Sequence, residues 1–190
     1  MTKIAAALVL FLLACASGYA DIVTWGSASL SDNNSGAFLS GFSINTSGPQ
    51  WILNLPNFSQ SDFAPFSGEV DLSVSANDTA SALIGVMFTY FGSIDQTNGP
   101  ATVSYIQTAS GSPGASGGFS TTPFSRTLFR PSSNHIDLTA QINLNDNGGL
   151  ASINKIEFDL VETPEPSSLP VLLAVLLGLA VCFRRRMRVS

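Results

Sequence analysis

The side chain best suited to acid–base or metal chemistry in this sequence is its single histidine, His135. No second histidine accompanies it and no cysteine lies near it, so the ligand set of a zinc site is missing. A Ser–His–Asp triad is formally possible, but no nucleophile elbow, a serine on a sharp turn from a strand to a helix, is expected. His135 stands at the start of an alternating apolar pattern, and we expect a polar residue at the edge of a sheet.

Two pairs of carboxylates could in principle hydrolyse glycosidic bonds, a reaction that uses two such groups. The pairs are Glu69 with Asp71 and Glu157 with Asp159, each two residues apart. Residues at this spacing share one face of a strand, and here it is the polar, outward face. Solvated carboxylates lack the burial that raises the pKa of a catalytic acid. We therefore expect no catalytic residues and no enzymatic activity.

Two turn-forming segments could hold a ligand. Residues 111–118, GSPGASGG, are rich in glycine but lack the Lys-Ser/Thr ending of a phosphate-binding loop, so a flexible loop is expected. Residues 143–149, NLNDNGG, gather oxygen donors at Asn145, Asp146 and Asn147, but they depart from the EF-hand pattern and offer one carboxylate. A hairpin turn is the favoured interpretation and calcium binding the alternative. No other metal site and no cofactor are expected.

Four aromatic residues could stack on sugar rings, as exposed aromatics do in carbohydrate-binding sandwiches. They are Trp25, Trp51, Tyr90 and Tyr105. All lie in or beside apolar strand patterns, so packing in the core is the favoured interpretation.

The elements that must position these residues are strands. Residues 69–75, 135–144 and 156–160 alternate apolar and polar side chains, which is typical of half-buried antiparallel strands. Residues 82–91 are apolar almost throughout and fit a central strand, with a buried helix as the alternative. About nine strands predict an all-β fold, an antiparallel β-sandwich that is jelly-roll-like. The remaining candidate strands, separated by turn-forming residues, are 22–25, 37–44, 51–55, 102–107 and 124–130.

Charge is spread unevenly along the chain. Residues 21–162, the expected sandwich domain, hold twelve Asp and Glu residues against Arg126, Arg130 and Lys155, for a net charge of −9. A surface this acidic repels phosphates and has no basic stripe, so no nucleic-acid partner is expected. The two cysteines lie outside this domain, which therefore has no disulfide framework.

The first twenty residues have the three parts of a secretory signal peptide. Lys3 supplies the positive charge, residues 4–14 form an apolar helix, and Gly18-Tyr19-Ala20 is a small-x-small cleavage pattern. We expect signal peptidase to cut after Ala20. The alternative is a lipoprotein signal, because LLAC at residues 12–15 resembles the site at which the cysteine, here Cys15, is lipidated.

Residues 163–190, TPEPSSLPVLLAVLLGLAVCFRRRMRVS, combine three features. Pro164 and Pro166 hold Glu165 in an extended conformation. The run 167–183 has no charge in 17 residues and would form a helix roughly 25 Å long, near the thickness of a bilayer's hydrocarbon core. We expect a transmembrane helix with the sandwich domain outside the cell. The basic residues that follow, and that would mark the cytoplasmic side, are Arg184, Arg185, Arg186 and Arg188.

Taken in order, PEPSS, LLAVLLGLAV and FRRRMR resemble the PEP-CTERM protein-sorting signal over residues 163–188. Proteins of that family are exported by Gram-negative bacteria that make exopolysaccharide, and their tails are recognised by exosortase, an intramembrane cysteine protease-transpeptidase. The resemblance implies that Pro164, Glu165 and Pro166 form the sorting motif. It also implies a precursor anchored in the inner membrane that is later delivered to the cell surface or the extracellular matrix.

Together these features predict a non-enzymatic exported protein of the cell surface or the exopolysaccharide matrix of a biofilm. Signal peptidase and exosortase would be its processing partners, and exopolysaccharide a further candidate partner. The alternatives are a carbohydrate-binding or adhesion module and, less favoured, a secreted enzyme that acts on glycans.

Overall fold

A computed structural model describes residues 23–59, 66–79 and 82–163 of the chain. The expected signal peptide, the lipidation site, the sorting motif Pro164–Glu165–Pro166, the apolar segment and the arginine cluster lie outside the described residues. The described part of the chain contains no helix that is long and apolar enough to cross a membrane. Its strands are β1 (Val23–Trp25), β2 (Ser29–Asp32), β3 (Ser43–Ser47), β4 (Gln50–Asn54), β5 (Phe66–Asp78), β6 (Leu83–Asp95), β7 (Ala101–Ala109), β8 (Ala115–Phe119), β9 (Phe124–Ser133), β10 (His135–Asp146) and β11 (Leu150–Glu162).

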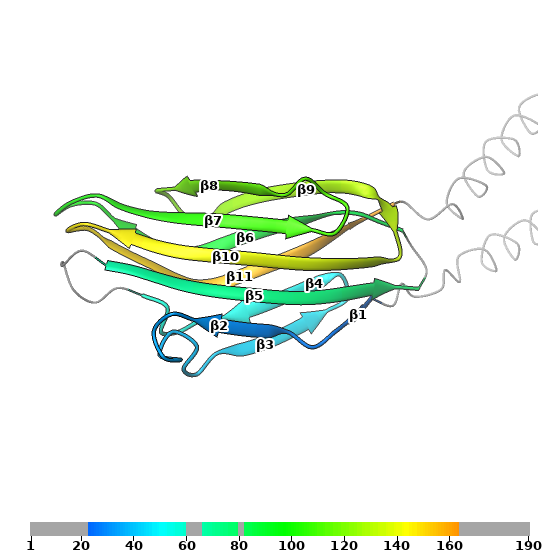
Figure 1. Cartoon of the computed structure of the whole chain (residues 1–190), viewed down its shortest axis with the longest axis horizontal. Coiled ribbons are helices and arrows are strands. Elements are labelled where there is room, and N and C mark those ends of the chain that lie inside the picture. The colour runs from blue at the N-terminus through cyan, green and yellow to red at the C-terminus, as the bar shows by residue number, and fades with distance from the viewer. Residues whose placement is uncertain (1–22, 60–65, 80–81, 164–190) are drawn as a thin grey trace, which may run out of the picture. The chain divides into compact units, whose positions relative to one another are not determined.

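The strands form two antiparallel sheets that pack face to face (Figure 1). One sheet has the order β1-β5-β10-β7-β8, with β2 also pairing with β5. The other has the order β3-β4-β11-β6-β9. The fold is therefore an all-β, two-sheet antiparallel sandwich, as the alternating patterns predicted.

One face of each long strand lies in the core. In β10, Ile136, Leu138 and Ile142 are fully buried, whereas Asp137 and Thr139 on the opposite face are exposed. This is the period-two pattern read from the sequence, because successive side chains of a strand point to opposite faces of its sheet.

Aromatic rings fill part of the space between the sheets. Trp51 of β4 stacks on Phe158 of β11 with ring centroids 5.1 Å apart, and Phe88 of β6 meets Phe158 edge-on at 4.7 Å. Such pairs add about 0.5–1.5 kcal/mol each beyond the burial of their surface. These ring contacts hold Trp51 in a fixed position in the core.

The strand predicted at 37–44 is wrong in its first half. Residues 37–41 form a bend and turns, and β3 begins at Ser43. The carboxylate of Asp32 organises this loop, since its Oδ1 accepts hydrogen bonds from the backbone N–H groups of Asn34 and Gly36 and its Oδ2 accepts one from Leu39. Backbone groups satisfied in this way do not need a neighbouring strand.

Residues 115–119 also differ from the prediction. They lie largely within the expected flexible loop at 111–118, but they form β8 at the edge of one sheet, paired with β7. Glycine, serine and alanine do not favour strands, so pairing with β7 determines this segment. The strand β2 also has no counterpart among the predicted strands, whereas the apolar segment 82–91 is strand β6 and not a helix.

Candidate functional site

The candidate site lies on one side of the sandwich, where β1 and β3 leave an edge of each sheet uncovered. In the antiparallel register, Trp25 of β1 lies opposite Ala76 of β5, and Thr46 of β3 lies opposite Trp51 of β4. Ala76 and Trp51 are buried in the core. Directly paired residues project from the same face of a sheet, so Trp25 and Thr46 face the space between the sheets. No third element among the described residues covers them, and a groove remains.

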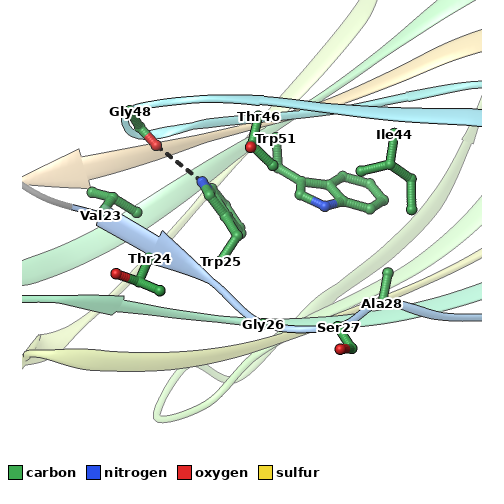
Figure 2. Close-up of a pocket in the computed structure, with 10 residues that line it drawn as sticks. All are labelled: Val23, Thr24, Trp25, Gly26, Ser27, Ala28, Ile44, Thr46, Gly48 and Trp51. Carbon is green, nitrogen blue, oxygen red and sulfur yellow. Dashed lines mark hydrogen bonds between the residues drawn. The ribbon is translucent and has the colours of Figure 1, made fainter.

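We call this site the Trp25 groove: Val23–Ala28 form one wall, Ile44, Thr46 and Gly48 the other, and Trp51 the floor. Its volume is about 420 Å³. Figure 2 shows the indole of Trp25 rising from β1 toward the β3–β4 turn. There its Nε1–H donates a hydrogen bond of 2.9 Å to the carbonyl oxygen of Gly48. This bond joins the two edges and fixes the orientation of the ring.

The chemistry of the Trp25 groove is apolar and uncharged. None of its ten lining residues is Asp, Glu, Lys, Arg or His. Val23, Trp25 and Ile44 supply apolar surface, and Thr46 supplies a hydroxyl group. This lining suits an uncharged ligand that has both apolar faces and hydroxyls, but it offers no pair of titratable groups for acid–base catalysis.

The four aromatic residues singled out in the sequence separate into two groups. Trp51, Tyr90 and Tyr105 are buried, as the prediction of core packing required. Trp25 is only partly buried, because it packs against the core with one part and lines the groove with another. The sequence pattern could not separate Trp25 from the others, since all four occupy inward positions of strands.

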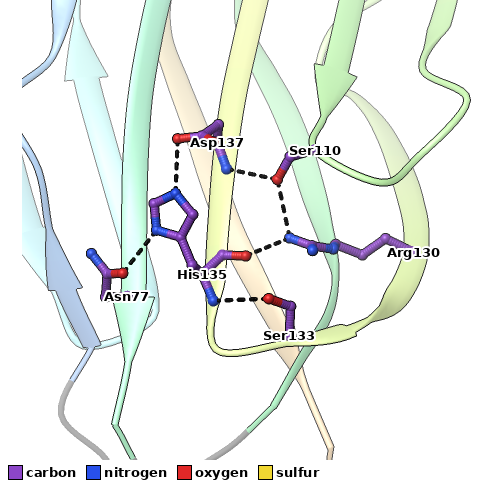
Figure 3. Close-up of polar contacts among 6 residues, drawn as sticks. All are labelled: Asn77, Ser110, Arg130, Ser133, His135 and Asp137. Carbon is purple, nitrogen blue, oxygen red and sulfur yellow. Dashed lines mark hydrogen bonds and ion pairs between the residues drawn. The ribbon is translucent and has the colours of Figure 1, made fainter.

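His135 begins a central strand, not an edge strand as expected, since β10 lies between β5 and β7. Both of its ring nitrogens have partners: Nδ1 lies 2.8 Å from Oδ1 of Asn77, and Nε2 lies 3.0 Å from Oδ1 of Asp137 (Figure 3). Ser133 Oγ accepts the backbone N–H of His135 and does not contact the ring nitrogens, which are bonded elsewhere. A Ser–His–Asp triad needs a serine hydroxyl on one ring nitrogen, so this geometry does not form one.

The neighbours of His135 join strand ends. Arg130 Nη1 donates hydrogen bonds to the carbonyl oxygen of His135 at 2.7 Å and to Ser110 Oγ at 3.3 Å. Ser110 Oγ also accepts the backbone N–H of Asp137 at 3.0 Å. The cluster in Figure 3 therefore links β5, β9, β10 and the turn after β7. We interpret this cluster as structural, because its hydrogen bonds hold the ends of these strands together.

The two carboxylate pairs lie on outward faces, but they are less solvated than expected. Asp71 accepts a hydrogen bond from Gln141 Nε2 at 3.0 Å, and Asp159 accepts one from Gln50 Nε2 at 3.0 Å. Glu157 forms an ion pair with Lys155, at 2.7 Å. The two amide contacts connect neighbouring strands, and the ion pair joins residues two positions apart on β11. Cross-strand polar pairs of this kind stabilise sheets.

The segment 143–149 forms the β10–β11 hairpin, as predicted. Among residues 23–59, 66–79 and 82–163, no group of three or more His, Cys, Asp or Glu side chains is placed to hold a metal ion. The spacing G-x-S-x-G does occur at 114–118, but its serine, Ser116, lies within the edge strand β8 and is not on a strand-to-helix turn. It is therefore not a nucleophile elbow.

A second hollow, of about 520 Å³, has no aromatic side chain among its described lining residues. Its lining includes Asn54, Asn154 and Lys155. The ammonium of Lys155 is already engaged, because it lies 3.8 Å from the ring centroid of Phe91 and 2.7 Å from Glu157 Oε1. The described lining of this hollow therefore offers a ligand neither an unpaired cation nor an aromatic ring.

No protein-family model matches the sequence, and no curated protein matches it. Solved structures with a similar fold include TmCBM61 in complex with β-1,4-galactotriose, at 12% identity and a TM-score of 0.35 over 76% of this chain and 90% of that one. The xylan-binding module CBM15 is 13% identical, with a TM-score of 0.31 over 76% and 99% of the two chains. CBM35 from Cellvibrio japonicus Abf62 is 16% identical, with a TM-score of 0.28 over 70% and 92%. At TM-scores this low the likenesses indicate neither a ligand nor a reaction for this chain.

Proposed function

We propose that this chain is an exported, non-enzymatic protein whose β-sandwich binds carbohydrate in the Trp25 groove. The observation that carries the proposal is the fixed, partly exposed indole of Trp25 in an uncharged groove. A sugar ring presents apolar C–H faces and hydroxyls at its rim. An aromatic ring beside a hydroxyl group can complement both.

The shape of the groove follows from rigid elements. Trp25 belongs to β1, which pairs with β5, and Ile44 and Thr46 belong to β3, which pairs with β4. The indole is also held by Gly48, so little side-chain freedom remains to be lost when a ligand binds. Preorganisation of this kind lowers the entropic cost of binding.

We also propose that the sandwich is jelly-roll-like. The strand order supports this proposal, because from β4 to β11 the chain alternates between the two sheets at every step except β7 to β8. The resulting orders are β4-β11-β6-β9 in one sheet and β5-β10-β7-β8 in the other. Each is a run of four neighbouring strands within its sheet. An arrangement of eight strands in two sheets is typical of jelly rolls.

The destination of the protein is proposed from its two ends. A signal peptide at 1–20 would export residues 21–162, and the Pro164–Glu165–Pro166 motif, the apolar run and the arginine cluster would present the tail to exosortase. Carbohydrate binding and this route fit together, because a matrix protein that binds exopolysaccharide would be retained where that polymer is deposited.

Binding is tested by affinity electrophoresis of the full chain in native gels that contain the host's exopolysaccharide. The detergent must have no sugar headgroup, since such a headgroup would compete for the groove. We expect retardation of the wild type and a loss of about 30-fold in affinity for Trp25→Ala, the effect of losing an aromatic anchor worth about 2 kcal/mol. Phe129→Ala is the matched control, because Phe129 is an aromatic residue of β9 that is 66% exposed and lies outside the groove. Equal mobility with and without polysaccharide would contradict the proposal.

The sorting proposal is tested by the intact mass of the C-terminal peptide of the protein purified from hosts with and without exosortase. A terminus between residues 164 and 168, seen only when exosortase is present, is the expected result. A terminus at Ser190 in both hosts would show that the tail is not cut.

A further inference from the structure

We propose that the ligand of the Trp25 groove is an uncharged glycan and not an acidic one. The groove binds this glycan along its length, as an extended chain, and not at a terminal sugar. This inference rests on the proposed carbohydrate-binding function and names the class of carbohydrate. It excludes polyuronates and sulfated glycans as ligands of this site.

The first argument is the absence of a cation in the groove. A carboxylate or sulfate that leaves water needs a positive partner, because burying an unpaired charge is costly. Among the residues that the structure describes, the ten that line the groove include no basic side chain. In residues 21–162 the basic residues are Arg126, Arg130 and Lys155, and none of these three lines the groove.

The positions of these three basic residues support the same conclusion. Arg126 lies on β9, the edge of its sheet opposite to β3. Lys155 is paired with Glu157, and Arg130 is bonded to the carbonyl of His135. Each cation is therefore on another strand or already engaged.

The second argument is the sign of the surrounding charge. Residues 21–162 carry a net charge of −9, which repels polyanions before they reach the surface. An acidic glycan would be repelled by this net negative charge and would gain no contact with a cation among the described lining residues.

The third argument concerns the shape of the ligand. One wall follows β3 from Ile44 and ends at Gly48 in the turn after it, a path of about 13 Å at roughly 3.3 Å per residue. The opposite wall follows the chain from Val23 to Ala28. A groove with two long walls accepts an elongated molecule. All five residues of β3 are exposed, and as an edge strand β3 has one row of peptide groups outside its pairing with β4, which glycan hydroxyls could contact.

The experiment is affinity electrophoresis of the full chain against soluble xyloglucan, β-1,4-galactan and dextran as neutral probes and alginate and polygalacturonate as anionic probes. Each gel is run at low and at high NaCl, since salt screens charge interactions and leaves apolar and hydrogen-bonding contacts nearly unchanged. We expect retardation by at least one neutral probe at both salt concentrations and none by the anionic probes. Longer oligosaccharides of that neutral glycan should compete better than its monosaccharide.

Two groove variants and one control assign the binding to this site. Trp25→Ala and Ile44→Ala should each weaken retardation by the neutral probe at least tenfold, and Phe129→Ala should leave it unchanged. Ile44 is 37% exposed, so its truncation tests the groove even where Trp25→Ala unfolds the protein. Retention of binding by both folded groove variants would overturn the assignment of the ligand to the groove.

The outcomes separate this inference from the function on which it depends. Retardation by alginate or polygalacturonate that disappears at high salt would overturn the neutral class and leave carbohydrate binding intact. Equal competition by monosaccharide and oligosaccharide would overturn the extended mode. A lack of retardation by every probe, including the host's exopolysaccharide, would overturn both.

Discussion

Gln107 and Tyr90 form a hydrogen bond between the two sheets inside the core. Gln107 of β7 and Tyr90 of β6 are both 0% exposed, and Gln107 Nε2 donates to the phenolic oxygen of Tyr90 at 2.6 Å. Oε1 of Gln107 is also buried, with no hydrogen-bond partner among the described residues. The two side chains are therefore a buried polar pair among apolar side chains. A double-mutant cycle can measure the coupling energy between them.

The Tyr90→Phe variant keeps the aromatic ring, which stacks on Phe119 with centroids 5.6 Å apart, and removes only the hydroxyl. It leaves the buried amide of Gln107 without its acceptor, and we expect a loss of about 1–3 kcal/mol in the free energy of unfolding. Gln107→Met leaves the hydroxyl of Tyr90 without a donor but also removes the unsatisfied Oε1. We expect this variant to cost about 1 kcal/mol, the lower end of the same range.

The double variant replaces both polar groups by apolar ones of similar shape, so its stability should return to within about 1 kcal/mol of the wild type. The coupling energy, the sum of the two single losses minus the loss in the double variant, would then be about 1–4 kcal/mol. Urea unfolding of the full chain, followed by circular dichroism, gives the four free energies, and each kcal/mol corresponds to about 4 °C in Tm for a domain of this size. A double variant whose loss equals the sum of the single losses would refute the hydrogen bond between the sheets.

Three further predictions concern single positions. Gly92→Ala should cost about 3 kcal/mol in urea unfolding, because a Cβ there would lie 1.9 Å from the carbonyl oxygen of Ser152; Gly118→Ala, with its nearest atom at 3.5 Å, is the control and should change little. The Asp95 carboxylate accepts hydrogen bonds from the hydroxyl and backbone N–H of Thr97, which lower its pKa below 3.8. Its contribution to stability is therefore present above that value and is lost as the pH falls through the lowered pKa; Thr97→Val should raise the Asp95 midpoint in an NMR titration, and an unchanged midpoint would contradict this cause. Burial raises the pKa of Tyr90 well above its ordinary value of 10.0, so the folded protein keeps this proton where the unfolded chain releases it. The free energy of unfolding should consequently fall as the pH rises above about 10, and less steeply in Tyr90→Phe; equal slopes for the two proteins would argue against a buried phenol.

The alternating segments were the part of the fold that could be predicted from the sequence. In β10, Ile136, Leu138 and Ile142 are apolar at every second position, and only a strand with one buried face places them all in the core. The same reasoning found β5 and the hairpin at 143–149, where the asparagines and glycines are typical of a turn. The two ends of the chain were likewise interpreted from composition and order, and the expectations on export and sorting remain predictions.

Other elements could not be predicted because their local residues do not specify them. The β8 segment, Ala115–Phe119, contains glycine and serine, and it becomes a strand because β7 offers a free edge. The loop before β3 looks apolar enough for a strand, but Asp32 binds three of its backbone N–H groups. Both outcomes depend on contacts that the segment's own residues do not specify, namely pairing with the neighbouring strand β7 in one case and the Asp32 side chain in the other.

The sequence by itself determined that Trp25 and Trp51 occupy inward positions of strands, because alternation assigns each residue to a face of its sheet. Only the tertiary structure decided that Trp51 is covered and Trp25 is not. Trp51 lies on β4, inside its sheet and stacked on Phe158, whereas Trp25 lies on β1, at an edge of the other sheet. The groove exists because two edges from different sheets meet and no strand in the described part of the chain closes the space between them. No local sequence pattern specifies which edges will meet.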